Sequence, residues 1–139
     1  MNMYTMYKRE KQLKINNFPM MFAFSKEQLE NGKIKLGVKD NNELLSNGGG
    51  GFIRKIDKEE FNNLIIQLDN ELKEKLNNDE FLFQALLYEI ANHEYCYSYD
   101  LTDSLEVLGL KENDVRADKR MNNILNKAIR EYKNNLDIY

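Results

Sequence analysis

The sequence predicts an α+β domain that is mostly helical, with a small N-terminal sheet packed on four to five helices. Three observations lead to this class. The chain has 139 residues, a length typical of one domain with one core. Apolar residues recur at helical spacing after residue 57, whereas two short apolar runs, 20–24 and 52–56, are typical of strands that pair with each other. A composition with 42% hydrophobic residues and one proline excludes disordered and collagen-like chains.

The elements expected before residue 57 are a helix over 3–16, a strand over 20–24, a helix over 26–36, a loop over 41–51 and a strand over 52–56. Pro19 ends the first helix, because its ring removes a backbone donor. Ser25 is a good N-cap for the second helix, and Gly32 is the candidate for a left-handed stop. We expect one domain over 1–139, in which residues 1–17 could form an N-terminal helical arm.

The second half of the chain is expected to be mainly helical. Predicted helices cover 58–77, the apolar run from Asp79 to His93, a short stretch from Asp103 to Gly109, and a last helix that begins at Asp118. The last helix carries an apolar stripe from Met121 to Leu136, with Leu125 near its middle. We expect this stripe to pack along the 58–77 helix or against a second subunit.

Composition also limits the compartment and the class of partner. The single cysteine, Cys96, excludes an intrachain disulfide, and no apolar run approaches the roughly 20 residues that span a bilayer. The first residues lack the apolar core of a secretory signal. We therefore expect a cytoplasmic protein that does not bind membranes.

Charge is distributed unevenly along the chain. The formal net charge is −3, but residues 57–106 hold thirteen acidic and three basic residues. An acidic face on the 58–77 helix, including Glu71 and Glu74, is thus a candidate surface for a basic partner, the alternative being ordinary solvated helix faces. Basic residues elsewhere are interspersed with acidic ones, so we do not expect direct binding to nucleic acid. The sequence is also compatible with a homo-oligomer.

The densest polar and aromatic stretch is Glu89–Asp100. Glu89 and His93 lie four residues apart and share a helical face; with Glu94 and Asp100 they could supply ligands for a metal ion. However, this is the only histidine in the chain and no HExxH motif is present. A histidine satisfied by neighbouring polar groups is the competing interpretation, and we expect no metal or other cofactor.

Three tyrosines alternate within the same stretch. In an extended segment Tyr95, Tyr97 and Tyr99 would all lie on one side. Beside Asn92 and Asp100, such a row could stack on a nucleobase and hydrogen-bond with it. The alternative is a strand whose tyrosines pack on the core with their hydroxyls in water.

A glycine-rich loop is the second candidate site. Four consecutive glycines, among them Gly49 and Gly50, precede Phe52, Arg54 and Lys55. Exposed backbone N–H groups followed by two cations could hold an anion. The loop lacks the spacing of a known phosphate-binding motif, and a turn that needs positive φ explains the glycines equally. We expect the loop and the Asn92–Asp100 segment to form one concave site, with Arg54 and Tyr95 on its walls.

The order of four motifs carries a family resemblance. These are FAFSKEQLENG (22–32), GGGGFIRK (48–55), FLFQALLYEIANHEYCYSYD (81–100) and DSLEVLGL (103–110). In them the chain resembles a widespread, uncharacterised family of small proteins in phages, prophages and mobile elements of low-GC Gram-positive bacteria. The resemblance covers most of residues 18–132. It implies a phage origin and brings no established activity or catalytic residues.

The leading functional expectation follows from that resemblance. Small non-structural phage proteins often act against host defence. The expectation for this chain is an analogy with them and does not rest on any motif. We expect a non-catalytic accessory protein, anti-CRISPR-like or nucleotide-sequestering, that binds a host effector protein or a nucleotide signal. One alternative is a metal-dependent nucleotide or phosphoester hydrolase that uses Glu89, His93, Glu94 and Asp100. Another is a homo-oligomeric regulatory or structural module.

Overall fold

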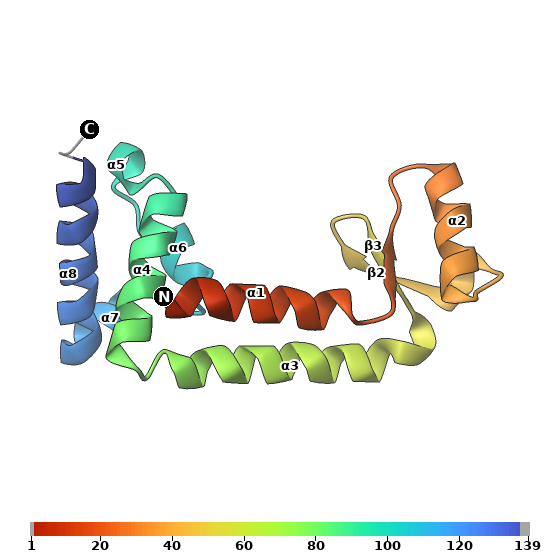
Figure 1. The fold of residues 1–139 in the computed structure, drawn as a ribbon, viewed down its shortest axis with the longest axis horizontal. Coiled ribbons are helices and arrows are strands. Elements are labelled where there is room, and N and C mark those ends of the chain that lie inside the picture. Colours follow the sequence, from red (N-terminus) through yellow and green to blue (C-terminus); the bar gives the residue numbers. More distant parts are fainter. Residues whose placement is uncertain (1, 137–139) are drawn as a thin grey trace. The chain divides into compact units, whose positions relative to one another are not determined.

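The structure is a computed structural model that describes residues 2–136 (Figure 1). Its regular elements are α1 (Met3–Asn16), β1 (Met20–Phe22), α2 (Lys26–Leu36), β2 (Leu44–Gly48), β3 (Gly51–Arg54), α3 (Lys58–Lys75), α4 (Asp79–Asn92), α5 (Tyr95–Ser98), α6 (Thr102–Glu106), α7 (Glu112–Ala117) and α8 (Lys119–Leu136). The prediction of a mostly helical α+β fold is confirmed. No described helix is long and apolar enough to cross a membrane.

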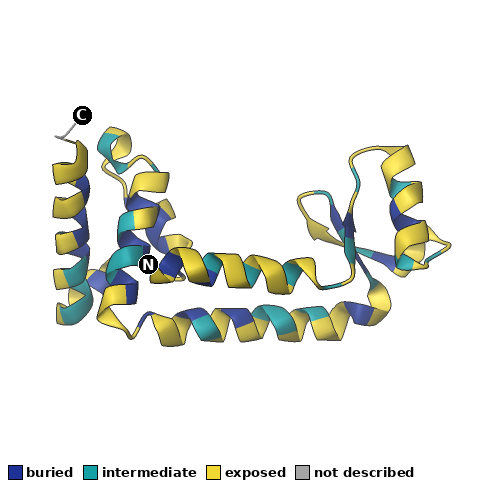
Figure 2. Ribbon diagram, in the orientation of Figure 1, coloured by how far each residue is buried: buried dark blue, intermediate teal, exposed yellow. Residues whose placement is uncertain are grey.

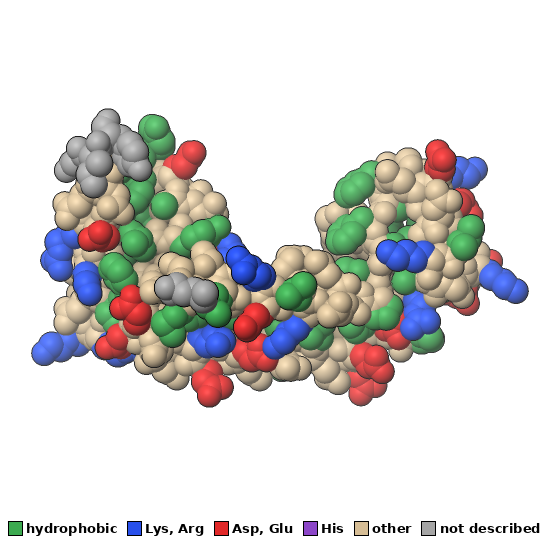
Figure 3. All heavy atoms as spheres, in the orientation of Figure 1, with side chains coloured by type: hydrophobic (Ala, Val, Ile, Leu, Met, Phe, Trp, Pro, Cys, Tyr) green, Lys and Arg blue, Asp and Glu red, His purple; other side chains and the backbone are tan. Residues whose placement is uncertain are grey.

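The chain divides into two compact units. One, the helical unit, comprises Met1–Tyr7 and Asn70–Tyr139; the other, the sheet unit, comprises Lys8–Asp69. Acidic and basic side chains are interspersed on the face drawn in Figure 3, rather than gathered into one patch of a single sign. The single-domain expectation stays a prediction, and each unit is described below by itself.

The core of the helical unit forms around α4. This helix buries Phe81, Leu82, Ala85, Leu86 and Ile90. Helix α8 packs along it through its own buried stripe, visible as dark blue in Figure 2. That stripe consists of Leu125, Ala128, Ile129 and Tyr132. The prediction that the last helix packs along the 58–77 helix is therefore wrong: α4 is apolar almost all round, so it can bury a second face against α8.

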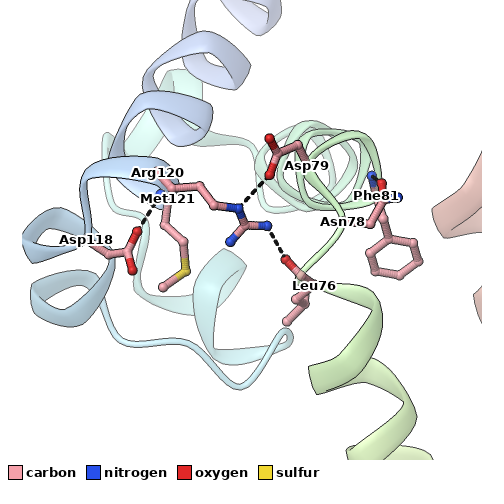
Figure 4. Close-up of polar contacts among 7 residues, drawn as sticks. All are labelled: Leu76, Asn78, Asp79, Phe81, Asp118, Arg120 and Met121. Atoms are coloured by element: carbon pink, nitrogen blue, oxygen red, sulfur yellow. Dashed lines mark hydrogen bonds and ion pairs between the residues drawn. The ribbon is translucent and has the colours of Figure 1, made fainter.

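The junction of α3, α4 and α8 is tied together by Arg120 (Figure 4). Its Nη2 donates to the backbone oxygen of Leu76 at 2.7 Å, and its Nε donates to Asp79 Oδ1. The predicted start of α8 is confirmed, since Asp118 Oδ1 accepts from the N–H of Met121 at 2.9 Å. The N-cap of α4 is Asn78 rather than Asp79, and its side chain accepts from the N–H of Phe81 at 2.9 Å. The predicted start of α6 at Asp103 is wrong, because its N-cap is Leu101 and no side chain caps it. Two short helices, α5 and α7, have no counterpart among the predicted helices.

The sheet unit contains a three-stranded antiparallel sheet in the order β1–β3–β2. The expected pairing of the two apolar runs is confirmed, with Met20 opposite Ile53 and Met21 opposite Phe52. The interpretation of residues 41–51 as loop is wrong, since β2 pairs with β3 through Leu45 opposite Ile53. This strand is hard to predict because its second half, Ser-Asn-Gly, has the composition of a turn.

Helix α2 continues past Gly32, the glycine predicted to end it. Ser25 caps its start, accepting from the N–H of Gln28 at 3.2 Å, as expected. The helix runs through Gly32 and ends at Gly37, which has the left-handed φ of 72°. Gly32 is instead a point of close packing: a Cβ there would lie 1.7 Å from Sδ of Met21. The glycine lets α2 approach β1.

Candidate functional site

The Asn92–Asp100 segment is helical rather than extended. After α4 ends at Asn92, the chain turns and forms the single-turn helix α5. The expected extended row of tyrosines is therefore wrong. Because residues four apart share a helical side, Tyr95 and Tyr99 lie together, with ring centroids 5.7 Å apart. Tyr99 is nevertheless 70% exposed, and Tyr97, on another side of α5, is 82% exposed.

The backbone is strained at both ends of α5. Glu94 has φ 53° and Tyr99 has φ 54°, and no other described non-glycine residue has a positive φ. Side chains rarely adopt this left-handed conformation, which costs free energy and is concentrated at functional sites. The two strained residues turn the chain so that Tyr95 and Tyr99 face α8.

A pocket of about 250 Å³ lies between α5 and α8, and we call it the tyrosine pocket. It is lined by Tyr95, Cys96, Tyr99, Tyr132, Lys133 and Leu136. The ring of Tyr95 is central, since it meets Tyr99 nearly at right angles and has its centroid 6.3 Å from that of Tyr132. Three aromatic rings thus surround a space that a flat ring could enter.

The polar groups of the tyrosine pocket are few. Tyr132 Oη accepts a hydrogen bond from the backbone N–H of Cys96 at 3.3 Å, which joins α5 to α8. A tyrosine hydroxyl is protonated at neutral pH and can donate a hydrogen bond, and burial raises the pKa of Tyr132 further. Lys133 is exposed and forms no ion pair with any residue from 2 to 136. The pocket therefore offers aromatic faces, tyrosine hydroxyls and one positive charge.

His93 and Glu89 lie outside the tyrosine pocket and contact other residues of the helical unit. Glu89 is 1% exposed, and its Oε1 accepts from the hydroxyl of Tyr4 at 2.7 Å. His93 Nε2 lies 3.2 Å from the other carboxylate oxygen, within ion-pair distance but without the geometry of a hydrogen bond. Ser104 Oγ donates to the backbone oxygen of Glu89 at 3.1 Å. The contacts around Glu89 are therefore structural, but the buried Nε2 of His93 has no hydrogen-bond partner among the described residues, so the interpretation of a satisfied histidine stays a prediction.

The alternative metal site has no matching geometry. Among residues 2–136, no group of three or more histidine, cysteine, aspartate or glutamate side chains is arranged to hold a metal ion. Asp100 acts within its own turn: its Oδ1 accepts from the N–H of Thr102 at 2.9 Å, and this bond lowers the pKa of the carboxyl. Glu94 occupies the strained turn before α5.

The glycine loop is the turn between β2 and β3. Gly48, Gly49 and Gly50 all have positive φ, so the backbone of the turn accounts for these glycines. Arg54 Nε donates to Asp57 Oδ2 at 2.7 Å, which engages its charge locally. Phe52 is half-buried in β3 and Lys55 is exposed. The loop belongs to the sheet unit and Asn92–Asp100 to the helical unit, and a site shared by them stays a prediction.

Sequence reasoning found part of the tyrosine pocket and missed the rest. Tyr95 is a lining residue, whereas Asn92, His93, Tyr97 and Asp100 are not. The members missed as site residues come mainly from α8: they are Tyr132, Lys133 and Leu136. Tyr132 continues the apolar stripe of α8, so nothing in its spacing distinguishes it from a core residue. Glu71, half-buried, and Glu74, exposed, both belong to α3, and their role in binding a partner stays a prediction.

The fold and the pocket define a small, mostly helical α+β protein with a small aromatic pocket beside a strained turn. Residues 3–131 match the family of unknown function DUF7659, and the chain belongs to this family. The expectation of an uncharacterised family is thereby confirmed. No curated protein and no solved structure matches the chain.

Proposed function

We propose that this protein is a non-catalytic binding protein whose tyrosine pocket takes the base of a nucleotide. The observation that carries the proposal is the group of Tyr95, Tyr99 and Tyr132 around an open space, held by a strained turn. Aromatic side chains stack on bases of any kind, because every base has a π face. Strain of this type persists where the surrounding structure holds a functional geometry.

Size and charge narrow the class of ligand. A volume of about 250 Å³ is below the ~300–1,000 Å³ range of pockets for drug-sized molecules, so it suits one flat ring system rather than a whole dinucleotide. Lys133 at the rim supplies a positive charge for a phosphate that remains outside. The hydroxyl of Tyr132 supplies a donor to a ring nitrogen or a carbonyl oxygen.

The biological role that we propose is the sequestration of a nucleotide signal of host antiviral defence, in the cytoplasm of an infected cell. It rests on the resemblance to small phage proteins described above and on the proposed pocket. A protein that only holds its ligand needs no catalytic group beside it, and most of the residues that line the pocket are tyrosines, which stack on a ring and donate hydrogen bonds.

Calorimetry with the full chain tests the proposal, using AMP, GMP, 3′,5′-cyclic AMP and a cyclic dinucleotide as probes. We expect at least one probe to bind, and we expect Tyr99→Ala to weaken it about tenfold or more, since a stacked base contributes ~1–3 kcal/mol. Lys133→Gln should weaken the binding of these phosphorylated probes and leave the binding of the matching nucleoside, adenosine or guanosine, unchanged. Tyr97→Ala is the matched control, because Tyr97 lies on α5 but is exposed outside the pocket.

Two results would contradict the proposal. One is the absence of binding for all four probes at millimolar concentration. The other is an equal loss of affinity in Tyr97→Ala and Tyr99→Ala, which would mean that the rings act through the fold of α5. Thermal unfolding of each variant separates lost contacts from lost structure.

A further inference from the structure

Strand β1 has one free edge. It is the outer strand of the order β1–β3–β2, and the N–H of Ala23 donates to the oxygen of Gly50 at 2.9 Å in the same register. Hydrogen-bonded pairs alternate in an antiparallel ladder, so Met21 bonds to β3 while Met20 and Phe22 direct their N–H and C=O groups outward. No bond from another described residue to these outward groups is present.

A groove of about 530 Å³ runs along this edge between β1 and α2. All three residues of β1 line one wall, and Gln28, Asn31, Gly32 and Lys35 of α2 line the other. These four positions share one side of the helix. Gly32 brings that side close to β1, because it packs directly on the side chain of Met21. The groove therefore combines unpaired backbone groups with a facing row of side chains.

The wall formed by α2 carries an uncompensated positive charge. Lys35 and Asn31 are exposed, and neither makes an ion pair or a side-chain hydrogen bond with the described part of the chain. Lys33, two residues away, differs: it is buried, with its Nζ 2.9 Å from Asn41 Oδ1 and 3.1 Å from Glu30 Oε1. Lys35 is thus available to an acidic group in the groove.

We propose that this edge groove binds an extended segment of a partner protein that carries an acidic side chain. The segment adds a fourth strand to the sheet, with its backbone bonded to Met20 and Phe22 and its carboxylate on Lys35. Addition of a strand to a sheet edge is a general mode of peptide recognition, in which backbone bonds give affinity and side-chain contacts give selectivity. The next outward N–H, that of Phe24, already donates to Gln28 Oε1 at 2.7 Å, so the added strand is short and ends beside Phe22.

Selection from a phage-displayed library of random nine-residue peptides against the full chain tests the proposal. We expect the selected peptides to contain Asp or Glu and to lack a central proline. A synthetic copy of one selected peptide is then N-methylated at one backbone position at a time. Methyl groups should weaken binding by roughly two- to tenfold at alternate positions only, because each backbone hydrogen bond contributes ~0.5–1.5 kcal/mol.

Two variants locate the peptide in the groove. Lys35→Glu should weaken binding about fivefold or more, since it replaces an attraction by a repulsion. Lys26→Glu is the matched control, because nine residues along a helix place Lys26 on the side of α2 away from the groove. Amide hydrogen exchange at Phe22 should slow when the peptide is bound.

Three results would overturn the inference. They are a library that yields no peptide above background, a methylation profile without alternation, and equal effects of Lys35→Glu and Lys26→Glu. Dimerisation of the chain through β1, detected by sedimentation and abolished by Lys35→Glu, would also overturn it in favour of a second copy as occupant. Tyr99→Ala should bind the peptide with unchanged affinity. The proposals for the tyrosine pocket and for the edge groove can therefore be tested independently of each other.

Discussion

The hydroxyl of Tyr4 donates a 2.7 Å hydrogen bond to Oε1 of Glu89, which lies 85 residues further along the chain. Both residues are almost fully buried, with exposed fractions of 2% and 1%. A buried carboxylate is costly unless it accepts hydrogen bonds, so this contact makes Glu89 compatible with an apolar core. The first turn of α1 is therefore part of the helical unit's core.

Removal of the Tyr4 hydroxyl is expected to destabilise the protein. Tyr4→Phe preserves the ring contacts with Phe81 and Tyr88 but leaves a carboxylate oxygen of Glu89 without this partner. The free energy of unfolding in urea should fall by about 1–3 kcal/mol. Tyr97→Phe, at an exposed tyrosine, is the control and should change it by less than about 0.5 kcal/mol. Equal effects of the two substitutions would mean that the buried bond adds no stability.

Because the hydroxyl of Tyr4 is buried, we expect the protein to lose stability at alkaline pH. Burial, and then the hydrogen bond to Glu89, raise the pKa of Tyr4 well above its ordinary value. The unfolded chain loses this proton near pH 10, whereas the folded chain keeps it, so unfolding becomes more favourable as pH rises above ~10.

Comparison with the phenylalanine variant isolates this contribution from the other titrating groups. Below pH 10 the stability difference between wild type and Tyr4→Phe should be constant. Above it, the difference should shrink by up to about 1.4 kcal/mol per pH unit, measured by urea unfolding at pH 8–11. A difference that stays constant up to pH 11 would contradict the raised pKa.

The apolar stripe of α8 predicts a large effect at its centre. Leu125 is fully buried, so Leu125→Ala should lower the free energy of unfolding by about 2–5 kcal/mol through lost transfer energy and the cavity that remains. Ile66→Ala, at a residue 56% exposed, should cost much less. A loss below about 0.5 kcal/mol for Leu125→Ala, the size of a surface effect, would contradict the packing of α8 on α4.

The strained turn before α5 predicts a gain of stability. Glycine adopts φ near 53° without the steric penalty that Glu94 bears, so Glu94→Gly should be more stable than Glu94→Ala by about 0.5–1 kcal/mol. The alanine variant controls for loss of the side chain, because it keeps the penalty. If the two variants unfold at the same urea concentration, the turn holds no strain.

Local signals explain which parts of the fold could be predicted. The caps at Ser25 and the long stripe of α8 are encoded within a few turns of chain, and the structure contains both. Strand β2 and helix α7 are short and polar, so they depend on neighbours that no local pattern reveals.

The tyrosine pocket was only partly predictable for a related reason. The alternation of Tyr95, Tyr97 and Tyr99 suggests a strand, but left-handed turns at both ends make the segment a helix and separate Tyr97 from the other two. Tyr132 joins them only because α8 packs on α4, which is a tertiary event. Pockets built between elements are therefore harder to predict than the elements themselves.

Gly32→Ala is a sharp test of packing in the sheet unit, since two effects predict opposite changes in the free energy of unfolding. Within a helix, Gly→Ala ordinarily stabilises by about 0.5–1 kcal/mol. At Gly32 the new Cβ would lie 1.7 Å from Sδ and 3.0 Å from Cγ of Met21, so the side chain must move or α2 must shift. Overpacking of this kind costs about 1–3 kcal/mol, and we expect it to dominate. Urea unfolding should show Gly32→Ala to be destabilising, with a smaller loss when Met21→Ala is already present. A stabilising Gly32→Ala would contradict the close contact of α2 with β1, and with it the shape of the edge groove.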